Sequence, residues 1–259
     1  MAQAFSGGGD PRRSLALLWG AAGPGRRGPK PSRSLDEVIA AAIGLADAEG
    51  LDAISMRRVA EAVGLSAMAL YTYVPSKAEL IDLMLDRAIG EAAQPPPETP
   101  GWRERLEFIA RQSWLLGQRH PWMLQVSTHR PPLGPNTLAR VETSLRAVDG
   151  LGLSDLEMDQ VIALVTDYVR GALRASMDAR EVEQHSKISD EQWLSLHRTL
   201  LQDMMDPERF PTTIRVGGAV RAAYERVLDR SRTFEFGLQR VLDGIGAFID
   251  ARKALVAPA

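Results

Sequence analysis

Residues 54–77 read ISMRRVAEAVGLSAMALYTYVPSK, and this stretch decides the fold of the amino-terminal half of the chain. Ser55 can cap a helix whose apolar residues recur three and four positions apart until Gly64, a residue type that ends helices readily. Ser66 follows two positions later and can cap a second short helix that Pro75 stops. Two short helices joined by a tight turn with a glycine predict a helix-turn-helix.

Further helices are predicted on both sides of this hairpin. Ser34 with Glu37 three residues later forms a capping box, which is typical of a helix start, and Gly50 can end that helix. Ser76 and Glu79 repeat the capping-box pattern and predict a longer helix after the hairpin. Residues 33–93 are therefore expected to form one helical domain.

The second helix of the hairpin has two different faces. Leu70 and Val74 lie four residues apart and are expected to face inward, whereas Met68, Tyr71 and Thr72 are expected to face outward. A recognition helix needs this arrangement, because one side packs on its partner helix while the other enters the major groove of DNA. Taken alone, a capped helical hairpin is more often plain packing, so both interpretations stay open at this point.

Charge is distributed unevenly along the chain. The 259 residues include 31 Lys and Arg against 33 Asp and Glu, so the net charge of -2 does not indicate nucleic-acid binding. Residues 33–93 hold five basic residues against ten acidic ones, and a DNA-binding surface there has to be local. Residues 1–32 are different, and we expect them to form a flexible basic arm able to reach a phosphate backbone. Its charged residues are Asp10 and the basic Arg12, Arg13, Arg26, Arg27 and Lys30.

The second half is also predicted to be helical. The proline-rich residues 94–101 indicate a linker, and residues 102–253 show helical periodicity without strand alternation. Asn136 is expected to cap a helix, and Ser154 with Glu157 forms a capping box that opens a long one. The first of these helices is expected to bury Leu138, Val141, Leu145 and Val148.

The last predicted helix has the clearest apolar stripe in the sequence. Such a face must be covered, either by the core of this chain or by a second copy. The stripe consists of Phe234, Leu238, Val241, Leu242, Ile245, Phe248 and Ile249.

The stretch 34–89 resembles the DNA-binding domain of the TetR family of bacterial transcriptional regulators. The resemblance is strongest in ISMRRVA (54–60), VGLS (63–66) and LYTYVPSK (70–77). It implies that the DNA-contacting positions are Arg57, Ser66, Ala67, Met68, Ala69, Tyr71, Thr72, Tyr73 and Lys77.

Base readout by this recognition helix is expected to be unusual. Ala67, Met68 and Ala69 cannot form the bidentate hydrogen bonds that identify a base pair, so their readout would be apolar. Specificity is then expected from Arg57, Thr72, DNA shape or the basic arm in the minor groove.

Residues 102–253 are similar to the carboxy-terminal domain of the tetracycline-repressor branch, notably in PPLGPN (131–136) and FEFGL (234–238). This similarity implies a helical bundle with a ligand cavity, whose long helix from Ser154 and last helix pair with a second subunit. Aromatic residues at helical spacing are more often core residues, so the ligand-contacting set is proposed only as a group. It comprises Phe108, Trp114, Trp122, Met123, Tyr168 and Met177. No histidine and glutamate pair that would hold a metal–drug chelate is identifiable.

Other functions find less support in the sequence. The chain has no cysteine, and Glu181 with His185 supplies two metal ligands without a third, so we expect neither metal nor cofactor. No catalytic motif is present, no apolar run reaches the roughly 18 residues of a membrane span, and the apolar stretch 15–19 is too short for an export signal. We therefore do not expect an enzyme, and we expect the protein to be cytoplasmic.

These patterns together predict an all-α protein. A three-helix helix-turn-helix domain (33–93) is joined by a long helix to a helical-bundle domain for ligand binding and dimerisation (102–253). We expect a homodimeric regulator, a repressor more than an activator, which binds a pseudo-palindromic operator and releases it on binding a small molecule. The alternative is a helical carrier or scavenger of small molecules with no regulatory role.

Overall fold

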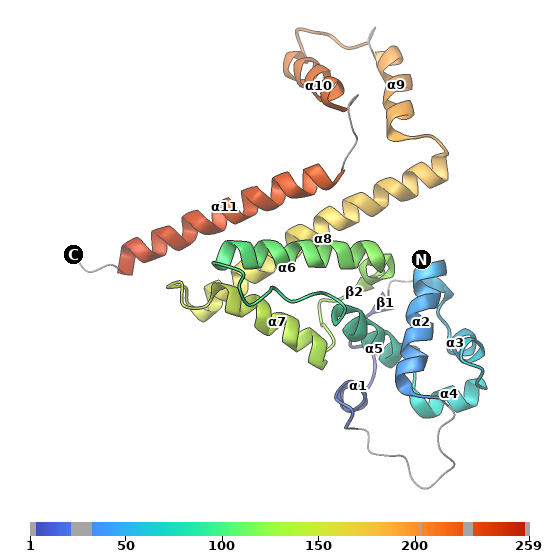
Figure 1. Cartoon of the computed structure of the whole chain (residues 1–259). Coiled ribbons are helices and arrows are strands. Elements are labelled where there is room, and N and C mark those ends of the chain that lie inside the picture. Colours follow the sequence, from blue (N-terminus) through green and yellow to red (C-terminus); the bar gives the residue numbers. More distant parts are fainter. Residues whose placement is uncertain (1–3, 22–32, 202–203, 225–229, 257–259) are drawn as a thin grey trace.

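The computed structural model describes residues 4–21, 33–201, 204–224 and 230–256, and the regular secondary structure in this part of the chain is almost entirely helical (Figure 1). The predicted all-α fold class is confirmed. The helices are α1 (Pro11–Leu18), α2 (Leu35–Glu49), α3 (Met56–Ala62), α4 (Ala67–Tyr73), α5 (Lys77–Ile89), α6 (Trp102–Arg119), α7 (Pro135–Val148), α8 (Asp155–Ser186), α9 (Asp190–Leu201), α10 (Pro211–Tyr224) and α11 (Arg230–Val256). Short 3-10 helices span Leu51–Ala53 and Pro121–Gln125, and a two-stranded parallel sheet joins β1 (Ala4–Phe5) to β2 (Val126–Ser127).

The helix-turn-helix is formed by α3 and α4, as the sequence predicts. The Ser55 side chain accepts a hydrogen bond from the backbone of Arg58, and Ser66 caps α4 by accepting one from Ala69 N. Gly64, in the turn between them, has a φ of +70°, a conformation that favours glycine. The two serine caps and this glycine together determine the tight turn, and α2 and α5 pack around it.

Two hydrophobic cores organise the molecule. The first lies among α2, α3, α4 and α5 and contains Val38, Leu70 and Met84, all fully buried. The second lies among α6, α7, α8 and α11 and contains Leu106 and Leu242. Most of the apolar stripe of the last helix is buried in this second core, so the chain itself covers it. Only Phe248 of that stripe is well exposed, at 38 %.

Helix α7 differs from the prediction. Gly134 is its N-cap residue and Asn136 lies inside the first turn, where its side chain donates a hydrogen bond to Asp86. Leu138 and Val141, which were expected to be buried, are 41 % and 45 % exposed. The buried side of α7 is partly polar, because α7 packs against Asp86 of α5 as well as against α6. The residues of that inner face are Thr137, Ser144, Ala147 and Val148.

The expectation of a flexible amino-terminal arm is wrong for residues 4–21. These residues form β1 and α1, and α1 packs against α5 (Figure 1). The Glu79 carboxylate accepts hydrogen bonds from the backbone of Asp10 and from the Ser76 hydroxyl. The Ser76 side chain accepts from Ala78 N, and the capping box predicted at Ser76 and Glu79 does not form. Arg26, Arg27 and Lys30 lie outside the described residues.

Helices α9 and α10 stand apart from both cores (Figure 1). They follow the carboxy-terminal end of α8 and leave several large apolar side chains exposed, among them Trp193, Leu196, Leu200 and Ile214. Within the described part of the chain, no helix is long and apolar enough to cross a membrane.

Candidate DNA-binding surface and ligand domain

The orientation of α4 agrees with that of a recognition helix. Leu70 and Val74 are fully buried, whereas Met68 is 77 % exposed and Tyr71 is 46 % exposed. Thr72 is also exposed, and its hydroxyl donates to the carbonyl oxygen of Ala69 at 2.7 Å. The predicted inner and outer faces are therefore confirmed, and the outer face is mixed apolar and polar.

The remaining predicted DNA-contacting residues surround this face. The Arg57 side chain is 83 % exposed and pairs with Glu61 at 2.8 Å, which raises the pKa of Arg57. Lys77 is the first residue of α5 and is partly exposed. Tyr73 is half-buried, and its hydroxyl oxygen accepts a long hydrogen bond of 3.4 Å from the backbone of Arg33. Tyr73 is thus partly structural.

The small residues at the start of α4 bring its backbone close to the surface. Ser66 is exposed, and Ala67 and Ala69 are only half-buried despite their short side chains. Met68 projects between them as the largest apolar group of the turn. A thymine methyl group is the kind of base feature that such a surface can contact.

The six residues proposed to contact a ligand do not form one group. Trp122 is 1 % exposed, and with Met123 it packs into the first core, among α2, α3, α4 and α5. Trp114 and Tyr168 belong to the second core. Phe108 and Met177 are half-buried. The structure thus divides the predicted set between two cores, because Trp122 and Met123 lie in the 3-10 helix Pro121–Gln125, which contacts α2 as well as α6 and α8.

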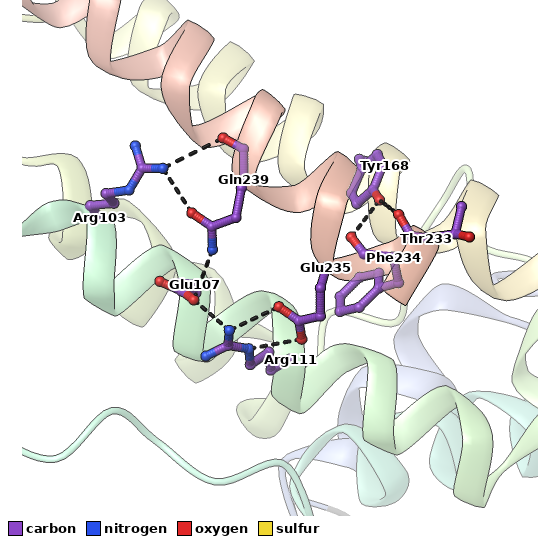
Figure 2. A network of polar contacts seen from close by, with 8 residues as sticks. All are labelled: Arg103, Glu107, Arg111, Tyr168, Thr233, Phe234, Glu235 and Gln239. Atoms are coloured by element: carbon purple, nitrogen blue, oxygen red, sulfur yellow. Dashed lines mark hydrogen bonds and ion pairs between the residues drawn. The ribbon is translucent and has the colours of Figure 1, made fainter. Parts of the chain in front are cut away.

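Phe234, which is not in the predicted ligand-contacting set, packs against two of its members. Its ring stacks on Trp114 with ring centres 4.3 Å apart and lies 5.9 Å from the Tyr168 ring. The Tyr168 hydroxyl donates to the carbonyl oxygen of Phe234 at 2.7 Å, as Figure 2 shows. An added Cβ on Gly237 would collide with the Tyr168 hydroxyl, so this glycine allows the approach. Three aromatic rings from α6, α8 and α11 therefore meet in the bundle.

Ion pairs hold α11 against α6 beside this ring cluster (Figure 2). Arg111 lies 2.5 Å from Glu107 and 2.8 Å from Glu235, and these carboxylates raise the pKa of Arg111 against the effect of burial. Arg103 donates to the Gln239 side chain at 2.8 Å and to Asp243 at 2.7 Å. Only the spacing of Glu107 and Arg111, four residues apart, was a sequence signal of this network.

The two domains meet at a buried histidine. His120 is 3 % exposed, with Nδ1 2.8 Å from Asp47 Oδ1 and Nε2 3.0 Å from Glu91 Oε2. Trp122 Nε1 also donates to Asp47, at 2.9 Å. Because Asp47 belongs to α2 and Glu91 follows α5, the end of α6 is fixed to the amino-terminal domain at two points. The sequence offered no pattern for this contact.

A second polar contact joins α5 to α7. Asp86 is 3 % exposed, and it accepts hydrogen bonds from Thr137 N and Thr137 Oγ1 at 2.8 Å and from the Asn136 side chain at 3.0 Å. Gly134, the N-cap residue of α7, has no side chain to satisfy the first amides of the helix. Asp86 takes over this role from another helix, where the helix dipole also favours a negative charge.

Arg140 of α7 lies in a strongly desolvated position. Its guanidinium donates to the carbonyl oxygen of Ile109 at 2.6 Å, to the Ser113 hydroxyl at 2.8 Å and to the carbonyl oxygen of Ala93 at 3.4 Å. These partners are neutral, and burial lowers the pKa of Arg140 to about 10. The side chain therefore joins α6 and α7 to the segment that precedes α6.

Comparison with known proteins identifies the family to which the chain belongs. Residues 38–84 match the model described as bacterial regulatory proteins, tetR family, and residues 94–249 match that described as tetracyclin repressor-like, C-terminal domain. The HTH-type transcriptional repressor DrrR1 of Streptomyces coeruleorubidus is 39 % identical over 98 % of this chain and 92 % of its own length. The tetracycline repressor protein class E of Escherichia coli is 23 % identical over 85 % of this chain and 94 % of its own length.

Solved structures of similar fold belong to the same kind of protein as the relatives found by sequence. Apo ActR from Streptomyces coelicolor superposes with a TM-score of 0.69 at 27 % identity, covering 86 % of this chain and 99 % of its own. ActR in complex with actinorhodin gives a TM-score of 0.70 at 26 % identity, covering 83 % of this chain and 96 % of its own. The chain therefore belongs to the TetR family of bacterial regulatory proteins and is a DNA-binding transcriptional regulator.

Proposed function

We propose that the protein is a homodimeric repressor that places one α4 in each of two major grooves of a pseudo-palindromic operator. The observation that carries this proposal is the exposure of Met68, Tyr71 and Thr72 on a helix whose opposite side is fully buried. Residues 33–93 bind DNA, residues 94–101 form a linker, and residues 102–253 bind the effector and the partner subunit.

The contacts with DNA divide into two kinds. Tyr71 and Lys77, with Arg57, donate to phosphate oxygens and set the register, while Met68 and Thr72 meet base edges. The pair between Arg57 and Glu61 is solvent-exposed, so a phosphate can replace the carboxylate at little cost. Basic residues before α2 add further phosphate contacts, which would offset the acidic balance of residues 33–93.

Exposed apolar side chains on the last helices support a dimer. Leu156 and Leu164 of α8 are 67 % and 50 % exposed, and Phe236 of α11 is 67 % exposed. Exposed apolar groups that gather in one patch mark a protein–protein interface, and the proposed dimer covers these three. A two-fold dimer through α8 and α11 has to hold the two recognition helices about 34 to 36 Å apart, or a multiple of that distance, for both to enter major grooves on one face of the DNA.

The effector is proposed to be an extended aromatic molecule. Trp114, Tyr168 and Phe234 provide aromatic surface in the bundle, and the related ActR structure holds actinorhodin. Phe108 and Met177 remain candidates for ligand contact, whereas Trp122 and Met123 do not, because they lie in the other core. Such a ligand relieves repression only by binding more tightly to the arrangement that does not fit DNA.

A footprint on the DNA upstream of the protein's own gene tests the proposal. The wild type should protect two half-sites related by two-fold symmetry, and added actinorhodin, as the first probe, should reduce that protection. The double variant Tyr71→Ala, Lys77→Ala should lose the footprint and keep its helical content. Arg146→Ala is the matched control, because Arg146 is an exposed cation on α7. If the double variant binds the DNA as the wild type does, or if the protein is a monomer, the proposal fails and a small-molecule carrier becomes the better interpretation.

A further inference from the structure

Helix α5 has three buried carboxylates on one side. Glu79, Asp82 and Asp86 are 4 %, 2 % and 3 % exposed, and they recur three and four residues apart along the helix. A buried carboxylate is tolerated when hydrogen-bond donors replace its water. The donors to Asp86 come from α7, whereas those to Glu79 and Asp82 come largely from residues 4–19, which we call the N-terminal segment.

Asp82 is the main anchor of the N-terminal segment. It accepts a hydrogen bond from Gly7 N at 3.0 Å and from the Ser14 hydroxyl at 3.3 Å. The Ser6 hydroxyl also lies 3.1 Å from Asp82 Oδ1. The turn that follows β1 and helix α1 are therefore tied to one carboxylate.

Glu79 provides a second anchor one helical turn earlier. Burial alone would raise the pKa of Glu79, but hydrogen bonds from the Ser76 hydroxyl and from Asp10 N outweigh this effect and the pKa is lowered. The charged form is therefore the one that fits the contact. Gly9 lies against the same carboxylate, and a Cβ at this position would be 2.5 Å from Glu79 Oε1. A side chain at position 9 would therefore force either the segment or the Glu79 side chain to move.

The other side of the N-terminal segment contacts the ligand-binding domain. Ser6 N donates to the carbonyl oxygen of Ser127 at 3.1 Å, which extends the pairing of β1 with β2. Trp19 Nε1 donates to the carbonyl oxygen of Leu133 at 2.9 Å. Arg170 of α8 donates in turn to the Val126 carbonyl oxygen at 3.2 Å. A continuous set of hydrogen bonds thus runs from α8 through β2 and the N-terminal segment to α5.

We propose that the N-terminal segment couples the ligand-binding domain to the DNA-binding domain, with Asp82 as the positioning residue that holds it on α5. This inference rests on the proposed function, because it concerns how the effector signal reaches the recognition helix. The segment lies outside the ranges 38–84 and 94–249 of the two family models, so the coupling is an addition to the two domains that define the family. Movement of α8 then displaces β2 and, through residues 4–19, shifts α5 and the adjoining α4.

Two adjacent glycines offer a matched pair of variants. Gly9→Ala should push the segment away from Glu79, since Glu79 is held in place by its other hydrogen bonds. Gly8→Ala is the control, because a Cβ at Gly8 meets its nearest neighbours at 3.6 and 3.8 Å, which are ordinary contacts. The two substitutions change composition equally and differ only in whether the segment stays docked.

Amide hydrogen exchange of the free full-length protein is the first measurement. In Gly9→Ala relative to Gly8→Ala, we expect exchange to rise about tenfold in residues 4–19, and also in β2 and α5, as when a hydrogen bond is lost. An increase confined to residues 4–19 would show that the segment is a surface attachment and would overturn the proposal. The double variant Ser6→Ala, Ser14→Ala repeats the test without adding a side-chain atom, and Ser186→Ala is its control. The double variant must also show faster exchange in residues 4–19, β2 and α5.

Binding of the upstream operator DNA provides the second measurement. Coupling is reciprocal, so DNA bound at α4 should change the exchange of residues 124–128 and of α8 around Arg170 in the wild type and in Gly8→Ala. Gly9→Ala should bind DNA but lose at least half of that remote change. An equal remote change in both variants would refute the coupling. If no variant binds DNA, the proposed function has failed, and the exchange of the free proteins still decides whether the segment constrains α5.

Discussion

The outer face of α4 and the buried side of α5 are close in sequence and opposite in character. Met68, Tyr71 and Thr72 are exposed and make few contacts within the chain. Asp82 and Asp86 are almost fully buried and accept several hydrogen bonds from other segments. The first surface can change its partner without affecting the fold, whereas the second determines how the domains are held together.

This difference predicts which measurements each region should affect. Substitutions on α4 should change operator binding and leave the free energy of unfolding almost unchanged. Substitutions on the buried side of α5, or at the His120 contact, should change stability and the relation between the two domains. A variant that affects both measurements equally would break the distinction.

The largest effect on stability is expected from Asp86→Ala. Removing this carboxylate leaves the first amides of α7 and the Thr137 hydroxyl without their acceptor in a buried site, at a cost of about 3 kcal/mol. Urea unfolding followed by circular dichroism measures the loss. Asp36→Ala on the exposed side of α2 is the control and should change stability by less than about 0.5 kcal/mol. An equal effect of the two variants would contradict the role of Asp86 as a cap.

His120→Gln is expected to have the next largest effect, about 1 to 2 kcal/mol at neutral pH, because glutamine cannot reach both carboxylates with charge-assisted hydrogen bonds. Burial alone would raise the pKa of Glu91, but hydrogen bonds from His120 and Arg119 outweigh it and the pKa is lowered. A carboxylate whose pKa is lowered on folding stabilises the fold when the pH is above its ordinary pKa of 4.5. This stabilisation is lost as the pH falls through the pKa of the folded state. The difference between wild type and variant should therefore shrink below about pH 4.5 in unfolding experiments. A difference that stays constant from pH 7 to pH 3.5 would refute the contact with Glu91.

Sequence reasoning succeeded where a local rule fixes the structure. Ser34 with Glu37, and Ser154 with Glu157, form the predicted capping boxes, and Gly64 occupies the predicted turn. These features depend on residues three or four positions apart, which a single sequence displays. The two faces of α4 were predictable for the same reason.

The failures share the opposite property, because each depends on a partner far along the chain. Glu79 does not complete its capping box, and its carboxylate instead accepts a hydrogen bond from Asp10 N, 69 residues away. Trp122 was placed with the ligand-contacting residues, but it packs between the domains and donates to Asp47. Residues 4–21 looked flexible because a glycine-rich, basic composition says nothing of the buried carboxylates that bind them. Each of these contacts became visible only once the tertiary structure was known.

Tyr71→Phe on the outer face should weaken operator binding about tenfold, since one hydrogen bond to a phosphate is lost. The free energy of unfolding should not change, because Tyr71 is 46 % exposed. Fluorescence anisotropy with the footprinted DNA measures the affinity. Tyr73→Phe is a useful comparison, because the Tyr73 hydroxyl already accepts from Arg33 N, so this variant should also affect the fold. Loss of stability in Tyr71→Phe would show that Tyr71 has a structural role as well.

The smallest effect is expected from Arg57→Gln, and it concerns salt dependence more than affinity. If Arg57 exchanges Glu61 for a phosphate on binding, the variant should lower the slope of log affinity against log salt by about 0.9. The loss should be similar for specific and unrelated DNA, because a phosphate contact carries no base information. Glu61→Gln should act in the opposite direction, since it frees Arg57 in the unbound protein. If Arg57→Gln discriminates between the operator and unrelated DNA, then Arg57 reads a base, and readout by the outer face extends from α4 to the start of α3.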